Sequence, residues 1–254
     1  MADAAPPLLL FVVGPPAVGK MSVGQAIAER TGLRLFHNHI AIELALRYFD
    51  YGSPAFRRID GAIRRLVIEE VAASDLPGLV FTFVWAFDLP DEQAFIDECA
   101  RPFRERGARV LFVELEATQA ERLKRIAGVS RLAEKPSRRD LEASRRDLLD
   151  DDGRYQLNSG GKFDGRPDYL RIDNTVLTPG EVAERVIEHF ALPRSAGASP
   201  TCWGPRQKGS HVQDSPRTNG VACAGDHLDQ RRVRRRQDDA GAGTAPAAPG
   251  RDRL

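Results

Sequence analysis

Near its start the chain carries a glycine-rich segment with the spacing G-x4-G-K, and this segment restricts the fold more than any other feature. It reads Gly14-Pro15-Pro16-Ala17-Val18-Gly19-Lys20-Met21-Ser22. Residues 8–13 before it are all apolar, which predicts a short strand buried on both faces. Residues 20–30 after it place their apolar side chains on one face, which predicts a helix. The order strand, glycine loop and helix predicts the first unit of a parallel α/β sheet.

The glycine-rich loop has the chemistry of a phosphate site. Glycines let backbone N–H groups turn inward around phosphate oxygens, and the following helix directs the positive end of its dipole to the same place. Lys20 can reach the β and γ phosphates as a mobile positive charge. We therefore expect every residue of 14–22 to bind ATP and Lys20 also to be catalytic. The alternative is a glycine turn that binds no ligand.

Strands and helices alternate through the rest of residues 1–191. Short apolar runs predict four more strands, at 33–36, 79–87, 110–115 and 169–172. Helical periodicity predicts helices near Pro54, around Phe95, over 118–150 and after Thr178. The last of these begins with a capping box, Thr178-Pro179-Gly180-Glu181. We expect an α/β protein with the three-layer P-loop nucleoside triphosphate hydrolase fold, in which a five-stranded parallel sheet carries a helical lid at about 118–150.

Composition separates the end of the chain from the rest. Residues 192–254 hold 11 basic and 6 acidic residues and lose the apolar periodicity, so we expect a disordered basic tail. Residues 1–191, with 26 basic and 30 acidic residues, form the predicted folded domain. The longest apolar runs, 8–13 and 79–84, are too short to cross a bilayer, and the three cysteines imply no disulfide framework. We expect a soluble, cytoplasmic protein.

The hydroxyl of the phosphate loop comes one position late. Met21 follows Lys20, and Ser22 supplies the hydroxyl. This G-K-x-[ST] form resembles the nucleoside monophosphate kinases and related small-molecule kinases. The resemblance implies that Ser22 contacts a phosphate and that Mg²⁺ is held largely through water. The chain contains no guanine-reading N-K-x-D motif, which disfavours a regulatory GTPase.

The segment after the second predicted strand resembles the shikimate kinase family. It reads Phe36-His37-Asn38-His39-Ile40-Ala41-Ile42-Glu43 where that family has D-x-D-x-x-I-E, so His37 and His39 occupy the two Asp positions. Phe56-Arg57 resembles the family's F-R pair, and Ile172-Asp173-Asn174-Thr175 resembles its C-terminal end. The resemblance, which covers roughly residues 8–191, implies that Arg57 grips the substrate and that Asn174 and Thr175 border the adenine.

Two departures from that family concern the acceptor. No glycine follows the third predicted strand, where the family has a Gly-rich loop for the shikimate ring. Both acidic ligands are replaced by histidines, and imidazoles suit hydrogen bonding or proton transfer better than Mg²⁺ binding. We expect His37 and His39 at the substrate, with His39 accepting the proton of the attacking hydroxyl. A structural role and a transition-metal site are the alternatives. The kinase scaffold is inferred, but shikimate as substrate is not.

Charged residues farther along the chain complete the predicted site. Asp88 joins Ser22 as a candidate Mg²⁺ ligand, or else it starts a turn at Pro90. The Arg-rich region 118–150 resembles the lid that closes over ATP in small kinases, which implies that Arg125 contacts ATP and that Arg131 acts on the transferring phosphoryl group. The other arginines after Pro54 are expected on a solvated helix face: Arg58, Arg64 and Arg65.

These features predict an ATP-dependent small-molecule kinase. Its P-loop kinase domain, residues 1–191, would move the γ-phosphoryl group of ATP to a hydroxyl of a small molecule, with Mg²⁺ as cofactor. A nucleotide or nucleoside kinase is one alternative, and a non-catalytic ATP-binding regulatory protein is another. The expected partner is the small-molecule acceptor, and the expected state is a monomer or homodimer. Attachment to a membrane is not expected, and nucleic-acid binding is disfavoured.

Overall fold

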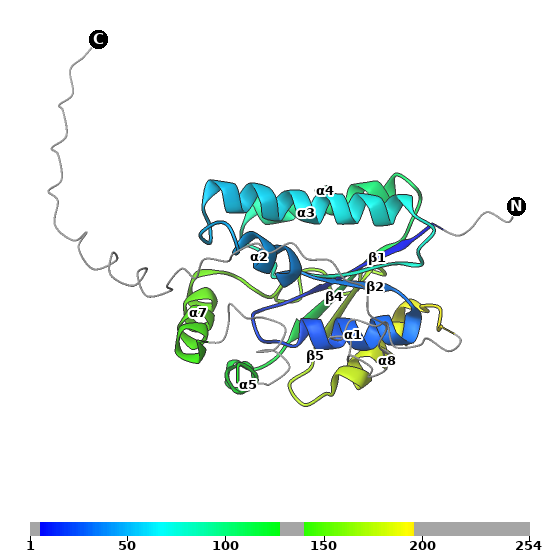
Figure 1. The fold of residues 1–254 in the computed structure, drawn as a ribbon. Coiled ribbons are helices and arrows are strands. Elements are labelled where there is room, and N and C mark those ends of the chain that lie inside the picture. The colour runs from blue at the N-terminus through cyan, green and yellow to red at the C-terminus, as the bar shows by residue number, and fades with distance from the viewer. Residues whose placement is uncertain (1–5, 128–139, 196–254) are drawn as a thin grey trace, which may run out of the picture. The chain divides into compact units, whose positions relative to one another are not determined.

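A computed structural model describes residues 6–127 and 140–195, and within them five parallel strands form one sheet (Figure 1). The strand order is β2-β3-β1-β4-β5. The strands are β1 (Leu8–Val13), β2 (Arg34–His37), β3 (Gly78–Thr82), β4 (Val110–Glu116) and β5 (Tyr169–Asp173). The helices are α1 (Lys20–Thr31), α2 (His39–Ala45), α3 (Pro54–Ala73), α4 (Pro90–Arg104), α5 (Gln119–Arg125), α7 (Leu141–Arg154) and α8 (Pro179–Phe190). The predicted α/β class and five-stranded parallel sheet are confirmed.

Helices cover both faces of the sheet, which makes three layers. In Figure 1, α3 and α4 lie above the sheet, and α1 and α8 lie below it. The side chains of β1 alternate between two cores: Leu10 and Val12 pack with residues of α1 and α8, whereas Leu9 and Phe11 pack with residues of α3 and α4. Every residue of β1 is buried, which explains why the run is continuously apolar instead of alternating.

The position of β1 in the sheet determines where the site lies. β1 pairs in parallel with β3 on one side and with β4 on the other, with Val12 opposite Thr82 and Val13 opposite Glu114. Because all five strands are parallel, their carboxyl ends meet at one edge of the sheet. The glycine-rich loop leaves β1 at this edge, where α/β sheets bind their ligands.

Strand β3 is shorter than the apolar run that predicted it. The run extends to Phe87, but β3 ends at Thr82 because the neighbouring strands β1 and β2 end at Val13 and His37. The aromatic residues beyond it pack into the core instead: Trp85 is 4% exposed and stacks on Phe87 at a ring-centroid distance of 4.2 Å. The apolar character of the segment therefore reflects burial and not strand pairing.

The helices agree with the sequence except at two places. The short helix α2 was not predicted. The region 118–150 is not one helix, since α5 ends at Arg125 and α7 begins at Leu141, while residues 128–139 of the predicted lid lie outside the described part of the chain. The capping box of α8 is confirmed, because Thr178 Oγ1 accepts the Glu181 N–H and the Glu181 carboxylate accepts the Thr178 N–H.

The described chain continues a few residues past α8. Leu192 is 5% exposed, Arg194 forms an ion pair with Glu184 at 2.6 Å, and the Ser195 N–H donates to the Arg30 carbonyl. The remainder of the predicted tail, residues 196–254, lies outside the described residues. Over the ranges 6–127 and 140–195, no helix is long and apolar enough to cross a membrane.

A buried carboxylate joins β4 to the segment before β5. Glu114 is fully buried, and its two oxygens accept hydrogen bonds from the Asn158 amide, the Ser159 N–H and hydroxyl, and the Tyr169 hydroxyl. Burial, together with the neighbouring charge of Glu114, raises the pKa of Tyr169 well above its usual range. Tyr169 therefore remains a donor to the carboxylate at physiological pH.

Replacing this carboxylate is expected to destabilise the fold. In Glu114→Gln the new amide would direct N–H groups at some of the four donors, and leaving buried donors without acceptors costs about 2–4 kcal/mol. Thermal unfolding measures the effect. Glu105→Gln is the matched control, because the Glu105 side chain is 62% exposed. Equal melting temperatures for the two variants would show that the Glu114 network does not stabilise the fold.

Candidate functional site

Three small residues in the loop between β1 and α1 have positive φ angles, which larger side chains adopt rarely. Gly14 and Gly19 have φ angles of 134° and 106°, and Ala17 has a φ of 61°. A Cβ atom on Gly14 would lie 2.4 Å from the Leu115 carbonyl oxygen, so the close passage of the loop over β4 excludes every side chain there. Two of these unusual angles fall on the glycines of the G-x4-G-K spacing, which is the physical reason for that spacing.

The first turn of α1 directly follows this loop. The helix begins at Lys20 without a side-chain N-cap hydrogen bond and with no acidic residue in its first turn. Such an N-terminus favours an anion through its N–H groups and the helix dipole. Lys20 reaches back over the loop, and its Nζ donates to the carbonyl oxygens of Gly14 at 2.6 Å and Pro15 at 2.8 Å. The ammonium group thus lies against the loop.

Residues far apart in the sequence meet at Val18. Its carbonyl oxygen accepts from Asn174 Nδ2 at 2.9 Å and from Arg125 Nη1 at 2.9 Å. Arg125 also donates to the carbonyl oxygens of Asn174 and Thr175. Hydrogen bonds from the Thr175 hydroxyl and N–H hold the pKa of Asp173 below its usual range. The structure therefore brings Arg125, Asn174 and Thr175 together beside the glycine-rich loop, and their predicted roles at ATP stay predictions.

The two histidines belong to different elements. His37 ends β2 opposite Thr82, whereas His39 begins α2, and both are half-buried. His39 Nδ1 lies 3.9 Å from Glu43 Oε1, one helical turn on. The Asn38 N–H between them donates to Thr82 Oγ1 at 3.2 Å. Sequence analysis overlooked Thr82, although a hydroxyl inside the otherwise apolar run 79–84 was a signal for it.

The remaining predicted site residues are not linked to the loop by any contact seen in the described chain. Asp88 is exposed, and its Oδ1 accepts the Gln156 N–H at 3.0 Å. Arg57 is exposed beside Gly52, where an added Cβ would lie 4.0 Å from its Nη2. Arg131 lies outside the described residues. The ligand roles of these three residues stay predictions.

One arginine of α3 is buried, contrary to the expectation of a solvated face. Arg64 forms an ion pair with Asp60 at 2.6 Å and lies 5.8 Å from the centre of the Phe95 ring. Burial lowers the pKa of Arg64 and raises that of Asp60, while their mutual attraction opposes both shifts. Asp60, four residues before Arg64, was the sequence signal for this pair. Arg58 and Arg65 are exposed as expected.

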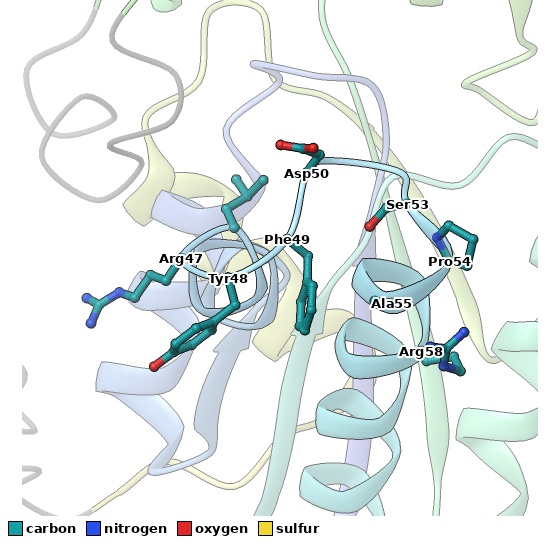
Figure 2. A pocket seen from close by; sticks show the side chains of 9 residues that line it. Arg47, Tyr48, Phe49, Asp50, Ser53, Pro54, Ala55 and Arg58 are labelled. Carbon is teal, nitrogen blue, oxygen red and sulfur yellow. The ribbon is translucent and has the colours of Figure 1, made fainter. Parts of the chain in front are cut away.

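A shallow groove lies on the connection between α2 and α3. It has a volume of about 650 Å³ and is lined by residues 46–50, 53–55 and 58. Figure 2 shows Arg47 and Arg58 on opposite sides of it, with their guanidinium groups directed away from each other. The two guanidinium groups therefore do not converge on one point in the groove.

Comparison with known proteins gives a partial sequence match and several likenesses of structure. A shikimate kinase of Rhodococcus jostii (strain RHA1) is 37% identical over 64 residues, which are 23% of this chain and 38% of that protein. The match therefore spans well under half of the relative's length. No protein-family model matches the chain.

Three solved structures illustrate the likeness of fold. A gluconokinase from Sinorhizobium meliloti 1021 is 16% identical at a TM-score of 0.46, covering 74% of this chain and 93% of its own. The APS kinase of Mycobacterium tuberculosis, solved with AMPPNP and APS, is 16% identical at 0.47, covering 74% and 99%. A shikimate kinase from Acinetobacter baumannii, solved with shikimate, is 19% identical at 0.44, covering 73% and 93%.

The strand order and the glycine-rich loop define the class of the protein. A parallel sheet with β1 at its centre, a glycine loop at the carboxyl end of β1 and a helix beginning at Lys20 form a P-loop α/β fold. The predicted fold class is thereby confirmed. The chain is similar to shikimate kinase over the matched residues.

The loop conformation predicts the effect of one methyl group. Gly14→Ala is expected to lower stability by about 2–4 kcal/mol and to abolish nucleotide binding, because its Cβ meets the Leu115 carbonyl and its φ is unfavourable. Gly153→Ala in α7 is the matched control, because nothing lies within 4 Å of its new Cβ. Thermal unfolding and calorimetric ATP binding measure both effects. Wild-type ATP binding by Gly14→Ala would contradict this account of the loop.

Proposed function

We propose that the protein transfers the γ-phosphoryl group of ATP to a hydroxyl of a small molecule. The observation that carries the proposal is the loop 14–19, which presents glycine backbone, a helix N-terminus and Lys20 at the carboxyl edge of the sheet. Phosphoryl transfer asks a protein mainly to position phosphates and to stabilise their charge, and these groups supply both. The partial match to a shikimate kinase supports the same reaction class.

The nucleotide roles divide between the loop and the segments beside it. The backbone N–H groups of residues 14–22 other than Pro15 and Pro16 surround the phosphates. Lys20 stabilises the transferring group, and the Ser22 hydroxyl contacts a phosphate. Asn174 and Thr175, which are hydrogen-bonded to Arg125 at the loop, border the adenine. Arg131 stabilises charge on the phosphoryl group from the predicted lid.

The acceptor lies on the side of β2 and α2 in this proposal. His39 takes the proton of the attacking hydroxyl, His37 orients the acceptor, and Arg57 binds an anionic group of it. The half-buried imidazoles at the carboxyl end of β2 support this placement, since that edge also carries the phosphate loop.

The residues present also fit Mg²⁺ bound mainly by phosphates and water. Among residues 6–127 and 140–195, no group of three or more His, Cys, Asp or Glu side chains could hold a metal ion. Mg²⁺ does not require one, because it keeps several waters and takes one or two protein oxygens with substrate phosphates. Ser22 and the second carboxylate oxygen of Asp88 would be those oxygens. Bound there, Mg²⁺ would neutralise phosphate charge.

The proposal assigns the reaction to residues 1–191 and none of it to 192–254. It places the protein in the cytoplasm, as a monomer or homodimer that meets a small-molecule acceptor and no membrane or nucleic acid. A nucleotide would be an acceptor of the same reaction class.

Calorimetry followed by an ADP-release assay tests the proposed function. The full chain is titrated with ATP in Mg²⁺, and the same sample then receives a panel of hydroxyl compounds that includes sugars, sugar acids and nucleosides. Acceptor-dependent ADP release is the expected result, and the productive compound identifies the acceptor class. ATP binding without turnover on any acceptor would favour a regulatory protein, and no ATP binding would contradict the phosphate site.

The charge of Lys20 is expected to matter more than that of any exposed lysine. Lys20→Ala should lower kcat by about 10²-fold or more, because it removes a contact that strengthens in the transition state. Lys162→Ala, which removes an exposed charge above the Phe163 ring, is the control and should keep wild-type rates. Steady-state kinetics decides the matter, and equal rates for the two variants would exclude the proposed role of Lys20.

The pH dependence of the reaction tests His39. A base must be neutral to accept a proton, so log(kcat/KM) should fall as the pH is lowered through the titration of the imidazole. In His39→Gln the rate should drop by about 10²–10⁴-fold and lose this acidic limb. His37→Gln is the comparison, and there the limb should remain. An unchanged acidic limb in His39→Gln would assign the proton transfer to another group.

A further inference from the structure

Arg125 uses all of its hydrogen-bonding capacity on the protein itself. Its side chain donates five hydrogen bonds, to Glu121 Oε1, the Val18 carbonyl, Asn174 Oδ1, the Asn174 carbonyl and the Thr175 carbonyl. A guanidinium group has five N–H donors. In this arrangement Arg125 therefore has no donor left for a phosphate oxygen, which leaves open what its position beside the loop achieves.

The geometry of the peptide unit gives an answer. In a planar trans peptide the C=O and the following N–H point in opposite directions. The Val18 carbonyl is held by Arg125 Nη1 and by Asn174 Nδ2, both at 2.9 Å. These two bonds direct the N–H of Gly19 to the other side of the loop. Gly19 has a φ of 106°, a conformation that glycine adopts readily and most other residues do not.

A second arginine of the same helix contacts the loop two peptide units earlier. Arg122 Nη1 lies 3.4 Å from the Pro16 carbonyl, so the N–H of Ala17 is turned in the same way. Arg122 is itself fixed by a two-point ion pair with Asp152 of α7, at 3.0 and 2.6 Å. The carbonyl groups of Pro16 and Val18 thus point toward α5. The N–H groups of the same two peptide units, which belong to Ala17 and Gly19, point away from α5.

We propose that Arg125 and Asn174 are positioning residues that fix the Val18–Gly19 peptide so that the Gly19 N–H faces the phosphates. They act on the polyphosphate through the loop, and this role is separate from the proposed place of Asn174 beside the adenine. The inference rests on the proposed function, because it assumes that the loop binds the phosphates of ATP. It deepens that function by naming what holds the loop in its binding conformation.

Binding of inorganic tripolyphosphate separates this role from a contact with adenine. The full-length variants Arg125→Lys and Asn174→Ala are titrated with ATP and with tripolyphosphate by calorimetry. Each variant should raise the Kd of tripolyphosphate, as well as that of ATP, by about 10–100-fold. Lysine keeps the positive charge of Arg125 but lacks the planar guanidinium group that donates to Val18, Asn174 and Thr175 at once. Asn174 carries no charge. A loss of charge therefore cannot explain weaker binding in these two variants.

Lys124→Ala is the matched control. It removes one positive charge from the same turn of α5, but the Lys124 side chain is 77% exposed and pairs only with Glu121 among the described residues. Its Kd values should stay within twofold of wild type. Tripolyphosphate binding within twofold of wild type in both Arg125→Lys and Asn174→Ala would overturn the inference, and weakened ATP binding alone would assign these residues to the base.

Hydrogen exchange of the full chain saturated with tripolyphosphate gives a second readout. Exchange at the amides of Ala17 and Gly19, which the bound phosphates would protect, should accelerate in Arg125→Lys and Asn174→Ala, while the amides of β1 keep their protection and show that the variants are folded. Wild-type exchange rates at the loop in both variants would also overturn the inference. If the wild-type protein binds neither ATP nor tripolyphosphate, the proposed function fails and the inference fails with it.

Discussion

The site depends on β1 being paired on both sides. With β3 and β4 as neighbours, β1 cannot shift without breaking two ladders, so the place where the chain leaves the sheet is fixed to one residue, Gly14. There the backbone passes the Leu115 carbonyl so closely that a Cβ would lie 2.4 Å from the oxygen. The pairing of β1 with its neighbours buries Leu9 and Phe11 in one core and Leu10 and Val12 in the other. It therefore also fixes the point at which the loop leaves the sheet. The packing of β1 and the position of the loop are consequences of one register.

Positively charged side chains reach the loop from two helices, α5 and α1. Arg122 and Arg125 approach it from α5, and each has a carboxylate partner, Asp152 and Glu121 respectively. Such compensated cations add little net potential, so their influence on the loop is geometric. Lys20 donates to the carbonyl oxygens of Gly14 and Pro15, and no acidic residue stands in the first turn of α1. In the proposed function Lys20 and the loop N–H groups bind the anion, and the contacts from α5 orient the loop.

The sequence predicts the parts of the fold that depend on local pattern and misses those that depend on distant partners. The continuous burial of β1 and the capping box of α8 depend on residues that are adjacent in the sequence, and both were predicted. The end of β3 was not, because it is set by where β1 and β2 end. Arg64 was expected in solvent, since its burial depends on α4 and Phe95. The contacts of Arg125 are the clearest case: they reach backbone carbonyls 50 and 107 residues away, and carbonyls leave no trace in a sequence.

The histidines at the β2 edge change the electrostatics that a carboxylate pair would give. A base that takes the proton of a hydroxyl becomes more positive, so its surroundings must stabilise the protonated form as the γ-phosphoryl group is attacked. In the proposed reaction Glu43 stabilises the protonated imidazole, because its Oε1 lies 3.9 Å from His39 Nδ1, one helical turn further along α2. Two carboxylates at positions 37 and 39 would instead place negative charge beside an anionic polyphosphate. An imidazole that accepts a proton would carry no negative charge beside the polyphosphate before phosphoryl transfer. After the transfer, in the proposed reaction, the imidazole would hold the proton of the hydroxyl, stabilised by Glu43.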